Sequence, residues 1–489
     1  MKCHPHLYEV NARIFIKRIS DKYCRKLTLT TVPEEEWQLL RSKGFDLIWF
    51  MGVWQNSPGS RQRALSDLTL RKEFAQALQD WTDDDITGSP YAIYSYNLDT
   101  SLGKPEGLLE LKSKLDRHGL GLILDFVPNH FALDHPWTFY HPEWFVQGRK
   151  EVIISHPDWF FSRNGNLYLA HGRDPYFLPW TDTVQVNFYS NELRQAMINE
   201  LLQIAEVADG VRCDMAMLAL NSVFEQVWGE IVKDYLRPQT EFWTDVIESV
   251  KRRRPDFIFI AEVYWGLERK LQQIGFDFTY DKLLYELLRF SSPNTIRDHL
   301  MVDDLYQWRS VRFIENHDEP RAVTAFGCER SLAAAAVIAT IPGLRFFHNG
   351  QLEGSKVRLP IQLVREPKEV DDPVVTQFYQ RLLAVCGQPA FHNGKWTLIK
   401  PEGTESHQNL LIWSWCYEKQ FKIVVINYSQ DPAQACLKLP SNFENVEKVV
   451  LRDELANMTY IRDSREVRSN VVYVDLGPWC TRILNLTAG

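Results

Sequence analysis

The sequence predicts an α/β fold, a (β/α)8 TIM barrel with a small domain inserted after the third strand and a C-terminal antiparallel β-sandwich domain. Two observations support this prediction. Eight apolar, strand-like segments recur along roughly the first four fifths of the chain, and most are followed by an amphipathic, helix-like segment. Four of these segments end in acidic and other polar residues, which a barrel would gather at one face.

The predicted barrel strands are short apolar runs, as expected for buried parallel strands. They are Tyr8–Ile14, Leu47–Met51, Leu120–Val127, Gly210–Cys213, Phe257–Val263, Phe276–Tyr280, Val311–Ile314 and Leu344–His348. The helix-like segments between them include Pro105–His118, Glu192–Ala208, Pro238–Arg253, Lys282–Ser291 and Ser331–Thr340. An open doubly wound sheet is the alternative, but no Gly-x-Gly-x-x-Gly motif follows the first strand.

Two regions depart from the alternating pattern. The connection from Phe131 to Val186 is too long for a simple loop and is rich in aromatic residues, which predicts an inserted domain at 131–186. After Gly387 the chain contains short strand-like segments separated by turn residues, which predicts a β-sandwich at 388–489. These strands are Trp396–Ile399, Leu410–Trp415, Lys422–Asn427, Ala435–Leu439, Val446–Leu451, Asn470–Val474 and Thr481–Leu486. The barrel would then comprise 1–130 and 187–387.

Composition excludes several functional classes. The formal net charge is −8, from 63 acidic and 55 basic residues, so the sequence does not indicate a nucleic-acid or anionic-membrane partner. No stretch is long and apolar enough to predict a membrane span. The 8 cysteines contain no C-x-x-C pair, which favours reduced thiols and a cytoplasmic protein. The oligomeric state is not predicted.

Four segments carry the candidate chemistry, because each ends an apolar run with carboxylates, histidine or arginine. They are Leu124–His130, Asp209–Asp214, Phe259–Val263 and Phe313–Asp318. Charged groups are rarely buried unless they are paired or functional. We therefore expect these segments to share one site.

Asp214 and Glu262 are the pair expected to do the chemistry. Glycoside cleavage uses one carboxylate at the anomeric carbon and one protonated carboxyl at the leaving oxygen. Both residues end neighbouring predicted strands, so they could lie within the ~5–5.5 Å expected of a double-displacement enzyme. Arg212 shares a strand face with Asp214 and would keep it ionised, whereas the apolar run before Glu262 would raise its pKa. A purely structural ion pair is the competing interpretation.

The four segments resemble, in order, the signature regions of the α-amylase family of glycoside hydrolases. The first has Asp125, Asn129 and His130 in the pattern Asp-x-x-x-Asn-His. The others match Gly-x-Arg-x-Asp, a strand-end glutamate and Asn-His-Asp. The resemblance implies that Asp214 is the nucleophile and Glu262 the general acid/base.

The resemblance also implies roles for the residues around this pair. Asp318 would hold the hydroxyls of the first sugar, and Arg212 would orient Asp214. The residues expected to contact that sugar are Tyr91, His130, His317 and Arg321, and those expected to support the site from behind are Asp125 and Asn129. The segment Trp180–Asn187 resembles a further family region, which we expect to be the hinge of the inserted domain.

A structural calcium ion is common in this family, but the sequence departs from the pattern that accompanies it. Many α-amylases have Lys-His where this chain has Met217 and Leu218, neither of which supplies a charge or a donor side chain. The run Asp83–Asp85 lacks the alternating spacing of a calcium loop. We therefore expect no metal and no cofactor, with a calcium ion as the alternative.

The resemblance predicts a retaining hydrolase that cleaves α-1,4-glucosidic bonds in starch, glycogen or maltooligosaccharides. A glucanotransferase or a trehalose synthase-type isomerase is an alternative, because it would use the same covalent intermediate. A non-catalytic carbohydrate-binding relative is a third. The motifs alone do not separate hydrolysis from transfer, and they do not predict chain-length preference or endo versus exo action.

Overall fold

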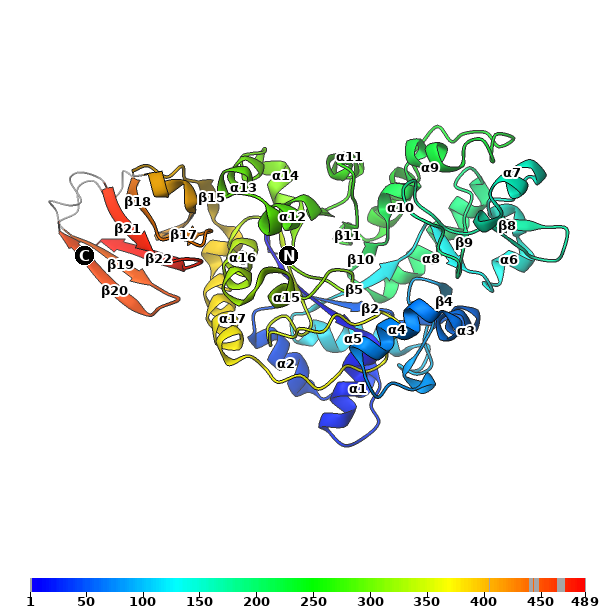
Figure 1. Cartoon of the computed structure of the whole chain (residues 1–489), viewed down its shortest axis with the longest axis horizontal. Helices are drawn as coiled ribbons and strands as arrows, with labels where there is room; N and C mark the ends of the chain where they lie inside the picture. Colours follow the sequence, from blue (N-terminus) through cyan, green and yellow to red (C-terminus); the bar gives the residue numbers. More distant parts are fainter. Residues whose placement is uncertain (1, 404, 439–442, 444–447, 464–470, 489) are drawn as a thin grey trace.

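The computed structural model describes residues 2–403, 405–438, 443, 448–463 and 471–488 (Figure 1). In these residues, eight parallel strands form a closed barrel in the order β1-β14-β13-β12-β11-β10-β5-β2. The strands are β1 (His6–Asn11), β2 (Leu47–Met51), β5 (Gly121–Phe126), β10 (Gly210–Cys213), β11 (Ile258–Ala261), β12 (Phe278–Tyr280), β13 (Ser310–Arg312) and β14 (Leu344–His348). The predicted barrel is confirmed.

The first strand is shorter than predicted. The apolar run Tyr8–Ile14 was expected to be one strand, but helix α1 (Ala12–Lys22) begins within it. The side chain of Asn11 accepts hydrogen bonds from the backbone N–H groups of Arg13 and Ile14 and so caps this helix. A strong cap therefore overrides the apolar pattern.

Helices cover the outside of the barrel, as Figure 1 shows. The five predicted helices are present as α5 (Gly107–Arg117), α8 (Asn191–Val207), α10 (Phe242–Arg253), α12 (Lys282–Phe290) and α16 (Cys328–Thr340). The chain also forms α2 (Glu34–Ser42) and α17 (Pro373–Cys386), which the sequence analysis did not identify. Residues 333–336 of α16 are four buried alanines, whose small side chains let this helix pack closely against its neighbours.

Residues 131–186 lie between β5 and β10 and occupy one end of the molecule in Figure 1. They contain short helices, α6 (Trp137–Tyr140) and α7 (Lys150–Ser155), and two small sheets. Strand β6 (His130–Ala132) pairs with β9 (Thr183–Gln185), and β7 (Phe160–Ser162) pairs with β8 (Tyr168–Ala170). The β6–β9 pair joins the two ends of this segment next to the barrel.

A second excursion, which the sequence analysis did not recognise, follows β2. It lies between β3 (Trp54–Asn56) and β4 (Ile93–Leu98) and contains α3 (Pro58–Ser66), α4 (Leu68–Ala77) and the 3-10 turn η2 (Asp83–Asp85). Its apolar residues pack with Leu363, which follows β14. The excursion thus lies against a loop at the same end of the barrel.

The C-terminal region forms an antiparallel sheet domain at the other end of the molecule (Figure 1). Six strands pair in the order β15-β16-β17-β22-β19-β20, and β18 pairs with β21. These strands are β15 (Lys395–Leu398), β16 (Leu410–Tyr417), β17 (Gln420–Asn427), β18 (Ala433–Lys438), β19 (Lys448–Asp453), β20 (Met458–Asp463), β21 (Val471–Leu476) and β22 (Thr481–Ala488). Strand β20 was not predicted, and the predicted strand residues Leu439, Val446, Glu447 and Asn470 lie outside the described residues.

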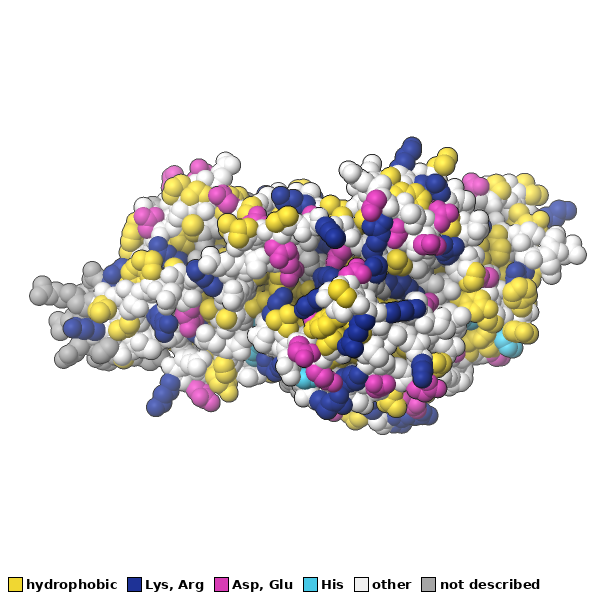
Figure 2. Space-filling view, turned by 90° about the horizontal axis from the view of Figure 1, so that it is seen from below, with side chains coloured by type: hydrophobic (Ala, Val, Ile, Leu, Met, Phe, Trp, Pro, Cys, Tyr) yellow, Lys and Arg dark blue, Asp and Glu magenta, His cyan; other side chains and the backbone are white. Residues whose placement is uncertain are grey.

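Surface and composition features can be checked in the same structure. Figure 2 shows lysine and arginine side chains interspersed with aspartate and glutamate on the face it draws. None of the helices in the described part of the chain combines the length and the hydrophobicity needed to cross a bilayer. All eight cysteines are free thiols.

Candidate active site

A cavity of about 360 Å³ lies at the C-terminal end of the barrel strands. Six of the ten predicted site residues line it, namely Tyr91, His130, Asp214, Glu262, His317 and Asp318. Asp214 and Glu262 directly follow β10 and β11, which pair in register with Cys213 opposite Ala261. The barrel therefore brings together side chains that lie more than two hundred residues apart in sequence.

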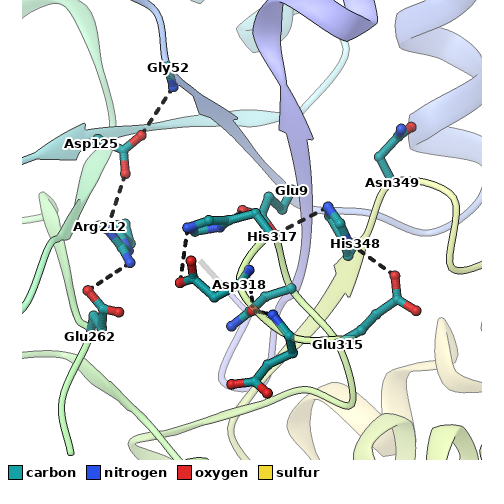
Figure 3. Close-up of polar contacts among 12 residues, drawn as sticks. Glu9, Gly52, Asp125, Arg212, Glu262, Glu315, His317, Asp318, His348 and Asn349 are labelled. Atoms are coloured by element: carbon teal, nitrogen blue, oxygen red, sulfur yellow. Dashed lines mark hydrogen bonds and ion pairs between the residues drawn. The ribbon is translucent and has the colours of Figure 1, made fainter. Parts of the chain in front are cut away.

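Arg212 is the central cation of the site and is almost fully buried. Its Nη1 lies 2.7 Å from Asp214 Oδ1 and its Nη2 lies 2.8 Å from Glu262 Oε2. Asp125 Oδ1 lies 3.7 Å from Nη1, so a third carboxyl faces the same guanidinium (Figure 3). The expected pairing with Asp214 is present, but Arg212 also orients Glu262, which the strand pattern alone did not indicate.

Burial dominates the protonation of the carboxyls. It raises the pKa of Glu262 to about 7 and that of Asp125 to about 7, although Arg212 opposes both shifts. Burial also raises the pKa of Asp214 above its ordinary value, against the attraction of Arg212. The sequence predicts that Arg212 keeps Asp214 ionised. The ion pair exists, but desolvation outweighs it, because one guanidinium is shared by several buried carboxyls.

Glu262 has two further hydrogen-bond partners. The backbone N–H of Met215 donates to Oε2 at 2.7 Å, and the hydroxyl of Tyr264 donates to Oε1 at 2.7 Å. These contacts fix the orientation of the carboxyl at the cavity. Tyr264 was missed in the sequence, although its position two residues after Glu262 places both side chains on the same side of an extended segment.

His317 is a buried cation on the opposite side of the cavity. Its Nδ1 contacts Glu9 Oε1 at 2.5 Å, and its Nε2 lies 2.8 Å from Tyr91 Oη and 3.2 Å from Asp318 Oδ2. Burial disfavours the charged ring, but Asp318 and Glu9 outweigh it and raise the pKa of His317 to about 9. The ring of Tyr91 stacks on His317 with centroids 5.4 Å apart. Glu9 was missed, although a glutamate inside a predicted buried strand is a usable signal.

His130 and Asn129 follow the third barrel strand. His130 lines the cavity, and burial lowers its pKa to about 4, so its ring is neutral near pH 7. Asn129 is buried and exchanges side-chain hydrogen bonds with Gln185, from Nδ2 to Oε1 at 3.2 Å and from Gln185 Nε2 to Oδ1 at 2.9 Å. This amide pair joins β6 to β9.

Arg321, which the resemblance implies contacts the sugar, is not among the residues that line this cavity. It is buried, and its Nη1 donates to Glu315 Oε1 at 2.8 Å and to the carbonyl of Asn349 at 2.6 Å. Glu315 also contacts His348 Nδ1 at 3.0 Å (Figure 3). Arg321 is close to Asp318 in sequence, but the buried carboxylate of Glu315 holds the Arg321 guanidinium beneath the loops that follow β13 and β14.

Several lining residues were not predicted. Trp180 and Asp182 line the cavity, although their segment was interpreted as a hinge. The excursion after β2 contributes Arg63 and Asp67, and the loop after β14 contributes Gln362. None of these positions lies at a strand end, so the pattern that revealed the other site residues could not reveal them.

The residues present do not fit a calcium cage where the family has one. The side-chain oxygen of Asn129 accepts a hydrogen bond from Gln185, and Met217 and Leu218 are buried apolar side chains. Across the described residues, no group of three or more His, Cys, Asp or Glu side chains is placed to hold a metal ion. Calcium prefers six to eight oxygen ligands, and the side-chain oxygen of Asn129 is already engaged by Gln185. No role for calcium is therefore assigned.

A barrel that presents paired, buried carboxylates at the C-terminal ends of its strands defines a class of enzyme that acts on glycosidic bonds. The family model "Alpha amylase, catalytic domain" matches residues 44–358. The chain therefore belongs to the α-amylase family and is a glycoside-acting enzyme.

Relatives named for two activities are similar to this chain. Alpha-amylase 3 of Dictyoglomus thermophilum is 22% identical over 452 residues, which cover 80% of this chain and 81% of that protein. An alpha-1,4-glucan:maltose-1-phosphate maltosyltransferase of Rhodospirillum rubrum is 25% identical over 322 residues, which cover 64% of this chain but only 40% of that protein. The family is therefore shared by proteins named as amylases and as maltosyltransferases.

Solved structures of the family share the fold over the whole chain. The maltogenic alpha-amylase AmyB of Thermotoga neapolitana superposes with a TM-score of 0.69 at 20% identity and covers 99% of both chains. An alpha-amylase of Lactobacillus plantarum gives a TM-score of 0.67 at 18% identity and also covers 99% of both chains.

Proposed function

We propose that the protein is a retaining glycoside hydrolase that cleaves α-1,4-glucosidic bonds in starch, glycogen or maltooligosaccharides. The observation that supports this most directly is the placement of Asp214 and Glu262. They follow two strands that pair in register, and neighbouring strands lie roughly 4.8 Å apart. That spacing suits the ~5–5.5 Å between carboxyls of a retaining enzyme better than the ~6.5–9.5 Å of an inverting one.

In the proposed reaction, Asp214 attacks the anomeric carbon and forms a glycosyl ester. The glycosidic bond breaks, and Glu262 gives its proton to the leaving oxygen. A water molecule then gives a proton back to Glu262 and attacks the same carbon, which releases Asp214 and a product with retained configuration. The raised pKa of Glu262, about 7, supports its assignment as the acid.

The surrounding residues are proposed to bind and orient the sugar. Asp318, whose side chain is half-exposed in the cavity, would accept hydrogen bonds from its hydroxyls. His130 and His317 would contact the same ring, and Tyr91 offers it an aromatic face. Asp125 and Asn129 would support the site from behind, and Arg321 is proposed to hold loops in place rather than to bind sugar.

Transfer to a sugar acceptor is the second candidate, as in a glucanotransferase or a trehalose synthase. It uses the same covalent intermediate, and several similar proteins are named as maltosyltransferases. A non-catalytic role is disfavoured because Asp214, Glu262 and Asp318 all line one cavity.

A reducing compartment such as the cytoplasm is proposed because all eight cysteines are free, six of them exposed.

The test is proton NMR of the first product formed from a maltooligosaccharide. Retention predicts that the α-anomer appears first and the β-anomer follows only by mutarotation. Initial β-anomer would overturn the assignment of Asp214 as nucleophile. Sizing the products with and without added glucose separates the two candidates, because a transferase makes products longer than its substrate or extends the glucose.

A further inference from the structure

One side of the cavity is a wall made by two segments that do not belong to the four polar strand ends. The excursion after β2, between β3 and β4, provides Arg63, Asp67 and Leu70, and the loop after β14 provides Ile361 and Gln362. The total volume of about 360 Å³ is near the lower end of the roughly 300–1,000 Å³ typical of small-molecule sites. The space suits a short piece of sugar chain rather than a long groove.

The two wall segments are bound firmly to each other. The backbone N–H of Thr87 donates to the carbonyl of Gln362 at 2.9 Å, and Ile86 forms an antiparallel bridge with Leu363. Arg365 binds both oxygens of Asp85, at 2.6 and 3.0 Å. Arg365 also pairs with Asp80 at 3.0 Å, and apolar residues of α3 and α4 pack on Leu363. These contacts make the wall a packed unit rather than two free loops.

The wall is also joined to the segment at 131–186. The hydroxyl of Ser60 donates to Asp182 Oδ2 at 2.7 Å, and Asp134 accepts hydrogen bonds from the Ser57 hydroxyl at 2.5 Å and from the Gly59 backbone at 3.0 Å. Because Asp182 itself lines the cavity, the wall and this segment meet at its rim. Polar contacts thus connect three segments around one side of the cavity.

The position of the wall relative to Glu262 tells which part of a substrate meets it. Glu262 follows β11 and would protonate the leaving oxygen, so the leaving part of the chain departs on the β11 side. The wall follows β2 and β14, the two strands that flank β1, and β1 lies directly across the barrel from β11. The sugar that stays on Asp214, and whatever is attached beyond it, must therefore point toward the wall.

In an α-1,4-glucan, each anomeric carbon faces the reducing-end neighbour, so the part that stays on the nucleophile is the non-reducing side. We propose that the wall makes this an enzyme that acts at the non-reducing end of α-glucan chains and removes short, fixed-length units. The proposal rests on the function proposed above and adds to it where along the chain the enzyme cuts.

Arg63 is the side chain best placed to receive the terminal sugar. It lines the cavity, and within the described part of the chain its side chain takes part in no ion pair or hydrogen bond. A guanidinium has five N–H donors in a fixed fork and can bind adjacent hydroxyls. The carboxylate of Asp67 is engaged by the start of α4, so Arg63 is the freer of the two charged wall residues.

The test uses two substrates of equal length, p-nitrophenyl maltoheptaoside and the same compound with an ethylidene acetal on its non-reducing terminal glucose. Their products are separated by chromatography and detected by the nitrophenyl group, which stays on the reducing-end fragment. The cap adds bulk only where the wall is expected to lie. The uncapped substrate should be cleaved with a kcat/KM at least ~10-fold above that of the capped one, a difference of ~1.4 kcal/mol in barrier. Early products should be of one size. Capped and uncapped rates within about twofold would overturn the proposal.

Binding separates this inference from the proposed reaction. The Glu262→Gln variant is titrated by calorimetry with uncapped and capped maltoheptaose, so no turnover is needed. Tighter binding of the uncapped sugar supports the proposal that the wall meets the non-reducing end. If the wild type then cleaves neither substrate, only the proposed hydrolysis fails. Equal binding of the two sugars overturns the proposed role of the wall.

A pair of wall variants provides the matched control. Arg63→Ala should raise the KM for the uncapped substrate and narrow the ratio between uncapped and capped rates. Gln62→Ala changes the adjacent exposed residue on the same helix, which does not line the cavity, and should leave both rates unchanged. If Arg63→Ala behaves like Gln62→Ala, Arg63 does not receive the terminal sugar.

Discussion

The charge balance of the site depends on Arg212. Its guanidinium carries one positive charge and lies within 3.7 Å of three carboxyl groups, those of Asp125, Asp214 and Glu262. Buried carboxyls that share one cation cannot all be ionised cheaply, so burial raises the pKa of each. A site of this kind holds at least one proton near neutral pH, which is what an acid catalyst requires.

Removing either carboxyl of the proposed pair should abolish turnover. Asp214→Asn deprives the sugar of its nucleophile, and Glu262→Gln leaves the leaving oxygen without a proton donor, so each should lower kcat at least ~100-fold. Circular dichroism should show an unchanged fold. A folded variant that keeps more than about a tenth of the activity, a loss of only ~1.4 kcal/mol, would show that its assignment is wrong.

The pH dependence of turnover should report the protonation of Glu262. Its raised pKa of about 7 means that it is protonated below this pH, so kcat/KM should fall as the pH rises through about 7. The Tyr264 hydroxyl donates to Glu262 Oε1 and stabilises the ionised form. Tyr264→Phe should therefore shift this limb to higher pH. Tyr473 is an exposed tyrosine in the C-terminal domain, so Tyr473→Phe should leave the limb where it is. A limb that is unshifted in both variants would contradict the assignment of this limb to Glu262.

At the scale of single elements, the pairing of β6 with β9 holds the segment 131–186 to the barrel. Asn129 and Gln185 are both almost fully buried and bind each other with reciprocal amide hydrogen bonds. Gln185 Nε2 also donates to the backbone carbonyl of Asn129 at 3.0 Å. Three contacts between two buried residues therefore stabilise this junction.

Gln185→Ala should destabilise the protein by about 1–3 kcal/mol, because it leaves the buried side-chain oxygen of Asn129 without the donor that Gln185 provides. The measurement is urea unfolding followed by fluorescence. Gln195→Ala removes an exposed glutamine on α8 and is the matched control, expected to change stability by less than ~0.5 kcal/mol. Equal midpoints for the two variants would show that the amide pair contributes nothing.

Calcium should not be needed for stability or activity. A bound ion stabilises the folded state only where its ligands are present, and the oxygen of Asn129 is already bound by Gln185. Melting curves and rates are measured after exhaustive chelation and again with added calcium. A reversible loss of more than a few degrees, or of activity restored by calcium alone, would reveal ligands that this structure does not bring together.

The strands could be predicted from sequence because a buried parallel strand is a continuous apolar run, and eight such runs with polar ends are a strong pattern. The excursion containing α3 and α4 could not, because its role depends on contacts with Leu363 and Gln362, nearly three hundred residues away. The contact of Arg321 with Glu315 could not be predicted, because the closeness of Arg321 to Asp318 in sequence does not reveal which carboxylate its side chain binds. Pairings made by tertiary packing are invisible to local patterns.

At the scale of the whole molecule, the barrel and the C-terminal domain share one core. The same buried cluster contains the alanines of α16 and, from β16 and β17, Trp413, Trp415 and Val424. Trp415 Nε1 donates to the carbonyl of Thr340 at 2.7 Å, and Arg297 Nη1 donates to the carbonyl of Leu410 at 2.9 Å. An interface this apolar resembles the interior of a domain rather than a mobile contact.

The chain should therefore unfold in a single cooperative transition in differential scanning calorimetry. A protein truncated after Gly387 would expose the apolar faces of α16 and its neighbours, so it should melt at lower temperature or aggregate. Two resolved transitions in the full chain, or an unchanged Tm after truncation, would show that the two parts are stable independently.

The closure of the barrel has a consequence for how the protein is made. His6 of β1 is opposite Arg345 of β14, and their side chains meet across 339 positions of sequence. Glu9, on the same first strand, supports His317. The edge of β1 that pairs with β14 therefore stays unpaired until β14 has left the ribosome, because long-range pairings form only after both partners exist. Synthesis on a ribosome slowed before residue 348 should yield a nascent chain with neither a closed barrel nor a complete site.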